Sequence, residues 1–218
     1  MTDVSWVVRR VDGSDSIEVF RRIARLHAER IHGGVLPLLG ETFLALLYRE
    51  IAKSEHGTVH EAVQDERLLG FIVGTPDIWR CALGFTLSGY LRLAAILSIR
   101  IWHPEIRRKF FDALLYPVRK PLLEEGNLRA QDKHRAELLA IAVSANTEGR
   151  GIGRAMVDAF ENTLRGKAGA YFVTTNANDT KSNAFYSALG FEKDGRKRHH
   201  DLLIQIYTKH VREDNQAL

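Results

Sequence analysis

The sequence predicts an α/β fold built as one domain, and three observations lead to this prediction. The chain has 218 residues, which is enough for one well-buried domain and short for two. Apolar residues recur with helical spacing in some segments and alternate in others, so helices and strands follow one another along the chain. An apolar run at 136–143 passes through a glycine-rich loop into a helical pattern, which is the order of a buried strand, a turn and a helix.

The composition is that of an ordinary folded protein with a small basic surplus. Hydrophobic residues make up 45% of the chain and charged residues 27%, which excludes the disordered and fibrous classes. Lysine and arginine number 31 against 27 acidic residues, a balance that favours anionic partners without requiring a nucleic acid. Cys81 is the only cysteine and no signal-peptide pattern opens the sequence, so we expect a cytoplasmic protein without disulfides or a thiolate metal site.

The first part of the chain predicts a strand, two helices and a hairpin. A polar turn at 12–16 precedes the first helical pattern, and the second begins after Pro37 and Gly40. Asp65 and Glu66 join two alternating segments as a short hairpin connection, although the favoured glycine is missing. The expected elements are a strand at 5–11, helices at about 17–27 and 41–54, and strands at 58–64 and 67–75.

Residues 77–134 are predicted to be a helical insertion, because the next segment that fits a strand is 136–143. Apolar residues recur at helical spacing from Tyr90 to Ile101. Arg92 and Arg100 interrupt this apolar stretch, so we do not expect it to span a membrane. Two alternatives stay open: a helix that covers the core or a partner subunit in a homodimer, and an amphipathic segment that lies on a membrane surface.

The last third of the chain predicts a helix, a strand, a second helix and a closing pair of strands. Gly190 is well placed to end the second helix, because the left-handed conformation after a helix is least costly for glycine. The expected elements are helices at 151–165 and 180–189, a strand at 170–175, strand residues at 191–192 and 202–209, and a frayed polar tail at 212–218.

The glycine-rich loop predicts a site for phosphate. Backbone N–H groups in the first turn of a helix have no partner within the helix, and the helix dipole favours an anion beside them. Gly149, Gly151 and Gly153 permit positive φ and a close approach, while Arg150 and Arg154 add positive charge. The segment matches neither of two familiar phosphate-binding motifs, G-x-x-x-x-G-K-[ST] and G-x-G-x-x-G.

Two segments resemble the GCN5-related N-acetyltransferase (GNAT) family. The first is R-G-x-G-x-A after the strand that ends at Val143, and the second runs from Asn178 to Phe191 and includes Asn183 and Tyr186. The resemblance covers residues 136–192. It implies a mixed, mostly antiparallel central sheet flanked by helices, with the helical insertion between the third and fourth strands. It also implies an acetyl-CoA-dependent N-acetyltransferase without a metal.

The resemblance further implies which residues bind acetyl-CoA. The splayed edge of the strand at 138–143 would pair with pantetheine, and one of its N–H groups would face the thioester oxygen. The family usually has Gln or Arg where this chain has Glu148, and a carboxylate beside a diphosphate is unfavourable unless Arg150 or Arg154 compensates. The implied cofactor-binding residues are Ile141, Ala142, Val143, Gly149, Arg150, Gly151, Ile152, Gly153, Arg154, Ala155, Asn176, Asn183 and Tyr186.

Acetyl transfer requires a group that protonates the leaving thiolate and a base for the amine. Tyr186 occupies the family's tyrosine position and is the candidate acid, against the alternative of a plain core tyrosine. Glu137 is the candidate base, on the same side as Leu139 and Ile141 if the strand alternates, against the alternative of a surface glutamate. Further candidates for the acceptor site are His27, His32, His199, His200 and Asp201, and no metal-ligand spacing connects them.

The acceptor is expected to be the primary amine of a small molecule, for example an amino-sugar nucleotide, which attacks directly in a ternary complex. The basic balance and the apolar insertion favour such a substrate. The alternatives are acetylation of a protein N-terminus or lysine, and a non-catalytic module that binds acyl-CoA. Nucleic acid is not expected, because the basic triplets at 107–109 and 196–198 have no aromatic residues interleaved with them.

Overall fold

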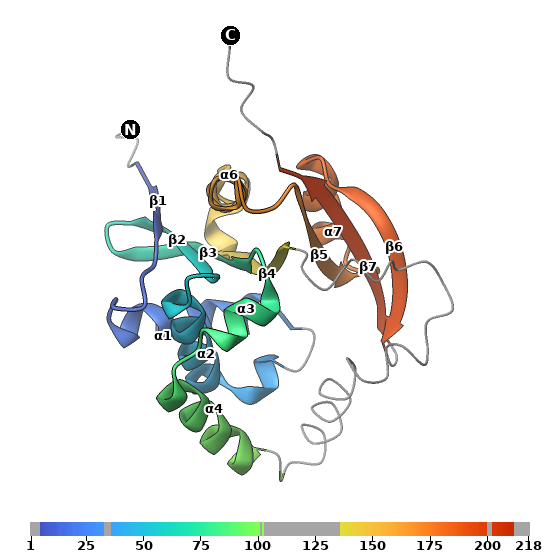
Figure 1. The fold of residues 1–218 in the computed structure, drawn as a ribbon. Helices are drawn as coiled ribbons and strands as arrows, with labels where there is room; N and C mark the ends of the chain where they lie inside the picture. The colour runs from blue at the N-terminus through green and yellow to red at the C-terminus, as the bar shows by residue number, and fades with distance from the viewer. Residues whose placement is uncertain (1–4, 33–35, 101, 103–135, 200–201, 212–218) are drawn as a thin grey trace.

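A seven-stranded sheet forms the centre of the computed structural model, which describes residues 5–32, 36–100, 102, 136–199 and 202–211 (Figure 1). The strand order is β1-β2-β3-β4-β5-β7-β6, and β4 and β5 form its one parallel pair. The mixed, mostly antiparallel sheet is thereby confirmed. The strands are β1 (Val7–Arg10), β2 (Thr58–Gln64), β3 (Arg67–Thr75), β4 (Ala136–Val143), β5 (Ala170–Asn176), β6 (Glu192–His199) and β7 (Leu202–His210).

Helices cover both faces of the sheet. Figure 1 shows α6 on one side of the sheet and α1 and α2 on the other. The described helices are α1 (Ile17–Arg30), α2 (Glu41–Lys53), α3 (Ile78–Leu83), α4 (Leu87–Arg100), α6 (Ile152–Leu164) and α7 (Thr180–Ala188), with 3-10 turns η1 (Leu36–Leu39) and η3 (Ala145–Thr147).

Each face has its own apolar core. Under α1 and α2, Phe20 and Tyr48 pack with Phe71 of β3. On the opposite face, Met156 and Phe160 of α6 pack on the sheet with residues of α7. Burial of a large apolar side chain contributes about 1.5–3 kcal/mol, so these two clusters hold the sheet and helices in one arrangement.

The sequence predicts the β2–β3 hairpin better than it predicts the edge strand β6. The hairpin between β2 and β3 turns at Asp65 and Glu66 as predicted, and both residues adopt positive φ, at 47° and 63°. Strand β6 is longer than the two residues expected at 191–192. Its sequence, EKDGRKRH, has no apolar alternation because β6 is an edge strand that pairs only with β7.

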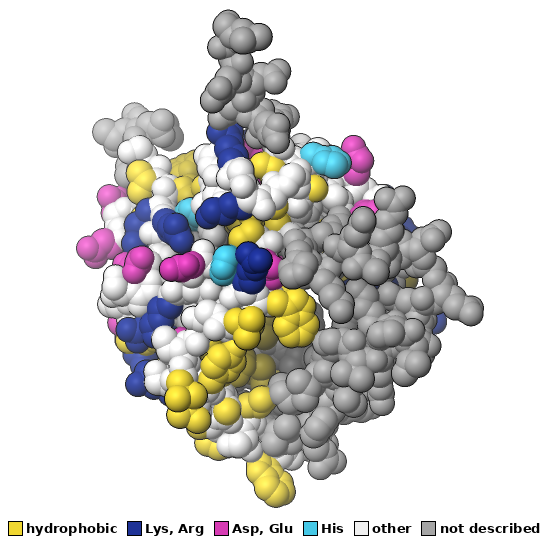
Figure 2. All heavy atoms as spheres, viewed as in Figure 1, with side chains coloured by type: hydrophobic (Ala, Val, Ile, Leu, Met, Phe, Trp, Pro, Cys, Tyr) yellow, Lys and Arg dark blue, Asp and Glu magenta, His cyan; other side chains and the backbone are white. Residues whose placement is uncertain are grey.

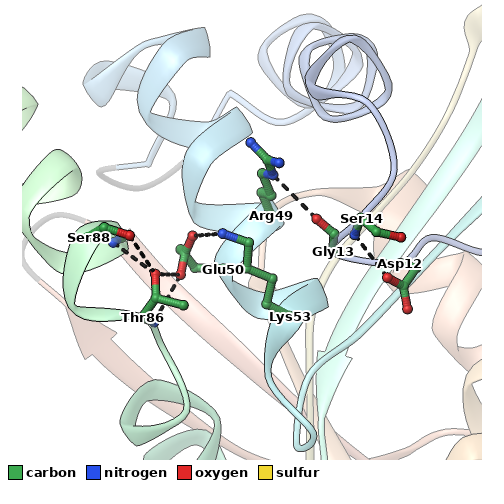
Figure 3. Close-up of polar contacts among 9 residues, drawn as sticks. Asp12, Gly13, Ser14, Arg49, Glu50, Lys53, Thr86 and Ser88 are labelled. Carbon is green, nitrogen blue, oxygen red and sulfur yellow. Dashed lines mark hydrogen bonds and ion pairs between the residues drawn. The ribbon is translucent and has the colours of Figure 1, made fainter.

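Helices α3 and α4 follow β3 within the predicted insertion, and one buried carboxylate ties them to α2. Glu50 accepts hydrogen bonds from Lys53 Nζ at 2.7 Å, from the Thr86 backbone N–H at 3.1 Å and from Thr86 Oγ1 at 2.8 Å (Figure 3). Thr86 directly precedes α4, so Glu50 stabilises the start of that helix. None of the helices in the described residues is long and apolar enough to cross a membrane. The rest of the predicted insertion, 103–135, and the tail at 212–218 lie outside the described residues.

Candidate active site

Strands β4 and β5 separate soon after they meet. They pair only at Ala136 with Tyr171 and at Glu137 with Phe172. Beyond Glu137, β4 continues to pair with β3 as far as Val143, and β5 continues with β7 as far as Asn176. Among the described residues, the main chain of 138–143 therefore has a neighbouring strand on one side only, and its other edge could pair with an extended ligand.

A bulge in β4 changes which side chains share a face. The register with β3 shifts between Val73 and Gly74, so that Leu139 has no partner of its own. Leu139 packs against the core under α1 and α2, whereas Ile141 packs against the core under α6. The expectation that Glu137, Leu139 and Ile141 lie on one side is wrong, because simple alternation does not continue through a bulge.

The glycine loop leads directly into α6. Gly149 and Gly151 both have φ of +79°, and a Cβ added at either would meet no atom within 4 Å. Gly151 is the N-cap of α6, and neither a side-chain hydrogen bond nor an acidic residue is present at the first turn. Gly153 has a different role, because its Cβ would lie 2.8 Å from Phe185 and block the contact between α6 and α7.

Charged residues around the loop compensate Glu148 in a way that the sequence did not indicate. Arg30, at the end of α1, forms an ion pair with Glu148 Oε1, and Lys181 Nζ of α7 lies 3.8 Å from Oε2. Arg150 and Arg154, the expected compensating residues, are both exposed, and Arg154 donates to the Ala188 carbonyl at 3.2 Å. Arg30 and Lys181, rather than Arg150 and Arg154, therefore compensate the charge of Glu148 beside the predicted phosphate loop.

Tyr186 lies in the aromatic core between α7 and the sheet and is 6% exposed. Its ring centroid is 5.3 Å from Phe191 and 5.6 Å from Tyr207. Burial, together with the charge of Asp179, raises the pKa of Tyr186 above that of an ordinary phenol. Its hydroxyl is protonated at neutral pH, as in an ordinary phenol, and the raised pKa makes it a weaker proton donor than a free phenol.

Asn183 holds the start of α7 against the end of β5. Its side-chain amide donates to the carbonyls of Asn176 at 3.1 Å and Ala177 at 3.2 Å. Its Oδ1 accepts from the Tyr207 hydroxyl at 2.9 Å, and Asn176 Oδ1 accepts from the Asn178 N–H at 2.9 Å. These contacts give Asn183 and Asn176 a positioning role, and their contact with pantetheine stays a prediction.

Glu137 stands where β4 and β5 part, half-buried and opposite Thr75 of β3. Burial raises the pKa of its carboxyl to about 7, against the opposing attraction of Lys197. A carboxylate with this pKa is matched to accepting a proton near neutral pH.

The remaining candidates are a buried histidine, an exposed histidine, and three residues whose side chains lie outside the described part of the chain. His27 is 2% exposed, and the Tyr48 hydroxyl lies 2.5 Å from its Nδ1. Burial lowers the pKa of His27 to about 4, so it is a neutral core residue, and the structure does not support its expected contact with an acceptor. His32 is exposed just after α1. His200 and Asp201 lie outside the described residues, as does the side chain of His199.

A model of the acetyltransferase (GNAT) family matches residues 37–191, well over half of the chain. The chain belongs to the GNAT acetyltransferase family. It is therefore an acyltransferase, and the family's co-substrate is acetyl-CoA. No curated protein matches its sequence.

Solved structures show the same fold at low sequence identity. The ribosomal-protein-S18-alanine N-acetyltransferase of Escherichia coli has a TM-score of 0.55 and 13% identity, over 98% of this chain and 99% of that one. A putative GNAT acetyltransferase of Desulfovibrio desulfuricans has a TM-score of 0.57 and 13% identity, over 95% of this chain and 100% of that one. Ard1 of Thermoplasma volcanium has a TM-score of 0.54 and 16% identity, over 96% of this chain and 100% of that one. At such identities the likeness establishes the fold alone.

Sequence reasoning on the acetyltransferase missed Arg30 and Lys181. Glu148 was the one residue that could have pointed to them, because a carboxylate next to a predicted phosphate site is unfavourable without a cation beside it. Arg30 is separated from it by 118 positions, so spacing along the chain gave no indication of the pair.

Proposed function

We propose that this acetyltransferase moves the acetyl group of acetyl-CoA to the primary amine of a small molecule that carries an anionic group, such as an amino-sugar nucleotide. The observation that carries the proposal is a cleft of about 510 Å³. Its volume is within the range of small-molecule sites. It is lined by Lys53, Ser54, Glu55, His56, Arg80, Leu83 and Gly84.

The cleft lies at the same end of the sheet as the candidate base. The His56 carbonyl accepts a hydrogen bond of 2.6 Å from Thr75 Oγ1, and Thr75 is the β3 partner of Glu137. Lys53, Arg80 and Glu55 are the charged residues of the lining, and Lys53 pairs with Glu50 at 2.7 Å while Arg80 pairs with Asp77 at 3.6 Å. The basic surplus of the whole chain, 31 lysine and arginine residues against 27 acidic residues, favours an acceptor with an anionic group.

The chemistry follows from the residues along the separated strands. Glu137 accepts a proton from the acceptor ammonium, directly or through water, and the neutral amine attacks the thioester carbonyl. A backbone N–H on the free edge of β4 (the segment Ile141, Ala142, Val143) stabilises the oxyanion. When the C–S bond breaks, the Tyr186 hydroxyl gives its proton to the thiolate. The second proton of the attacking nitrogen then restores the Tyr186 hydroxyl, directly or through water, so the products are an amide, free coenzyme A and the proton held by Glu137.

The co-substrate is held by the loop before α6. The N–H groups of the first turn, with Gly149, Gly151 and the guanidinium groups of Arg150 and Arg154, bind the diphosphate. We further propose that residues 77–134 are an insertion in a single domain and contribute to acceptor choice, because Arg80 and Leu83 of the cleft belong to it.

Incubation with acetyl-CoA and a panel of amines tests the proposal. The panel holds amino-sugar nucleotides, the same sugars without the nucleotide, polyamines and peptides with free N-termini or lysines. Free thiol measures turnover, and mass spectrometry identifies the acetylated product. We expect the highest kcat/KM with the anionic amino sugars. Turnover with peptides alone would contradict the proposal and favour a protein acceptor.

A further inference from the structure

Helix α4 is apolar on both of its faces. On the inner face, Leu93 packs with Leu39 and Phe43 in a small cluster of its own. On the outer face, Leu87, Leu91 and Ile99 follow at intervals of four and eight residues and are 76%, 63% and 74% exposed. A surface helix normally has one polar face, so this outer face requires a partner.

Neighbouring residues extend this face into a continuous surface. Trp79 and Leu83 of α3 are 53% and 80% exposed, and Trp102, just after α4, is 83% exposed. Figure 2 shows yellow side chains gathered over α3 and α4 in the lower part of the view. We call this surface the apolar stripe, defined by Trp79, Leu83, Leu87, Leu91, Ile99 and Trp102.

The charged residues in the segment that forms the apolar stripe are all arginines. From Ile78 to Trp102 the sequence contains Arg80, Arg92 and Arg100 and no Asp or Glu. Two carboxylates lie near it and both are buried: Glu50 accepts from Thr86, and Asp77 accepts from the N–H groups at the start of α3 and pairs with Arg80 at 3.6 Å. Arg92 is exposed and has no ion-pair partner among the described residues.

We propose that the apolar stripe docks on a membrane surface that contains anionic lipids. Leucine and isoleucine enter the acyl boundary, tryptophan suits the interface, and arginine binds anionic headgroups. A second copy fits less well, because a two-fold contact through this face would bring the two Arg92 side chains together, and no carboxylate among the described residues pairs with Arg92.

Vesicle sedimentation of the full chain tests the docking. We expect the protein to sediment with vesicles of phosphatidylcholine and phosphatidylglycerol, and to remain in solution with phosphatidylcholine alone. The double change Leu87→Ser with Leu91→Ser removes two outer side chains and should weaken sedimentation by at least about tenfold. Arg92→Gln should weaken it about fivefold at low salt.

Matched controls separate docking from misfolding. Val7 and Leu202 are also exposed apolar residues, but they lie on strands away from the apolar stripe. The double change Val7→Ser with Leu202→Ser should leave vesicle binding unchanged. All variants should keep the melting temperature and the acetyl-CoA affinity of the parent, so a failure of docking and a failure of the acetyltransferase site remain distinguishable.

Three results would overturn the proposal. The first is no sedimentation with anionic vesicles, which is also the outcome if residues 103–135 of the chain cover the apolar stripe. The second is equal sedimentation with neutral and anionic vesicles. The third is a dimer in light scattering that the Leu87 and Leu91 changes dissociate, because a second copy would then be the partner.

Discussion

The N-termini of α6 and α7 lie on the same face of the sheet, but they differ in whether a side chain of the protein caps the first N–H groups of the helix. Helix α7 begins at Asp179, whose carboxylate accepts from the Ser182 backbone N–H at 3.2 Å and from Ser182 Oγ at 2.6 Å. Helix α6 begins at Gly151 with no side-chain cap. One helix uses the chain's own carboxylate, and the other leaves its first N–H groups for an anion from outside.

The other described helices support this contrast. Helices α1 and α2 carry Glu18 and Glu41 in their first turns, and α3 is capped by Asp77. The start of α4 is held by Thr86 and Glu50. Among the α-helices that the structure describes, α6 is the one without a carboxylate at its start, and it has Arg150 and Arg154 instead. From this difference we propose that the start of α6 is the end of the molecule that binds the ligand.

Gly151→Glu should have the largest effect. The new carboxylate would occupy the anion site and repel the diphosphate, so we expect acetyl-CoA affinity to fall by at least about 100-fold, or ~2.7 kcal/mol. Gly166→Glu is the matched control, because Gly166 follows the other end of α6 with φ of +69° and equal open space. Both changes strain the backbone by about 1–2 kcal/mol. Equal loss of affinity in both variants, measured by calorimetry, would contradict the assignment.

Tyr186→Phe should lower kcat by about 100-fold and leave the acetyl-CoA affinity unchanged, because only proton donation is removed. Tyr207→Phe is the control: Tyr207 shares the aromatic core and bonds Asn183 Oδ1 at 2.9 Å. That change should reduce the free energy of unfolding by about 1 kcal/mol and leave kcat nearly intact. Steady-state kinetics with thiol detection decides between the two tyrosines, and equal effects on kcat would remove the acid role.

Glu137→Gln should lower kcat/KM by about 10- to 100-fold at pH 8 and change its pH dependence. The parent carboxyl has a pKa of about 7, so its basic form increases as pH rises from 6 to 8 and kcat/KM rises with it. The variant should lose this rise and keep only the ionisation of the acceptor amine. If kcat/KM rose equally between pH 6 and 8 in the parent and in the variant, Glu137 would be excluded as the base.

Asp179→Ala should separate helix capping from ligand binding. Removal of the cap of α7 should reduce the free energy of unfolding by about 1 kcal/mol in urea denaturation. Acetyl-CoA affinity should change by less than about twofold, because the α7 cap serves the fold. A large loss of affinity would mean that both helix starts belong to the binding site.

Glu148→Gln should have the smallest effect. Its ion pairs with Arg30 and Lys181 are partly exposed, and such pairs contribute about 0–1 kcal/mol. Loss of the carboxylate frees both cations for phosphate, so acetyl-CoA should bind about two- to fivefold more tightly at low salt. Weaker binding would show that Glu148 positions the loop.

The sequence predicted the fold well where side chains have one dominant environment. The strand at 136–143, the glycine loop and the helix after it carry local signals, and they form where the sequence predicted them. The acid role that the resemblance to the GNAT family implies for Tyr186 stays a prediction. Strand β6 was missed because an exposed edge strand needs no apolar pattern. The bulge at Leu139 and the pair between Arg30 and Glu148 depend on how distant segments meet, which local periodicity does not encode.

The central claim is that the open start of α6 binds the diphosphate of acetyl-CoA. Isothermal titration of the parent protein with acetyl-CoA and with S-acetylpantetheine, which lacks the diphosphate, tests it most directly. We predict that S-acetylpantetheine binds at least about 100-fold more weakly and that only the affinity for acetyl-CoA falls with added salt. Equal affinity for the two thioesters would contradict the account.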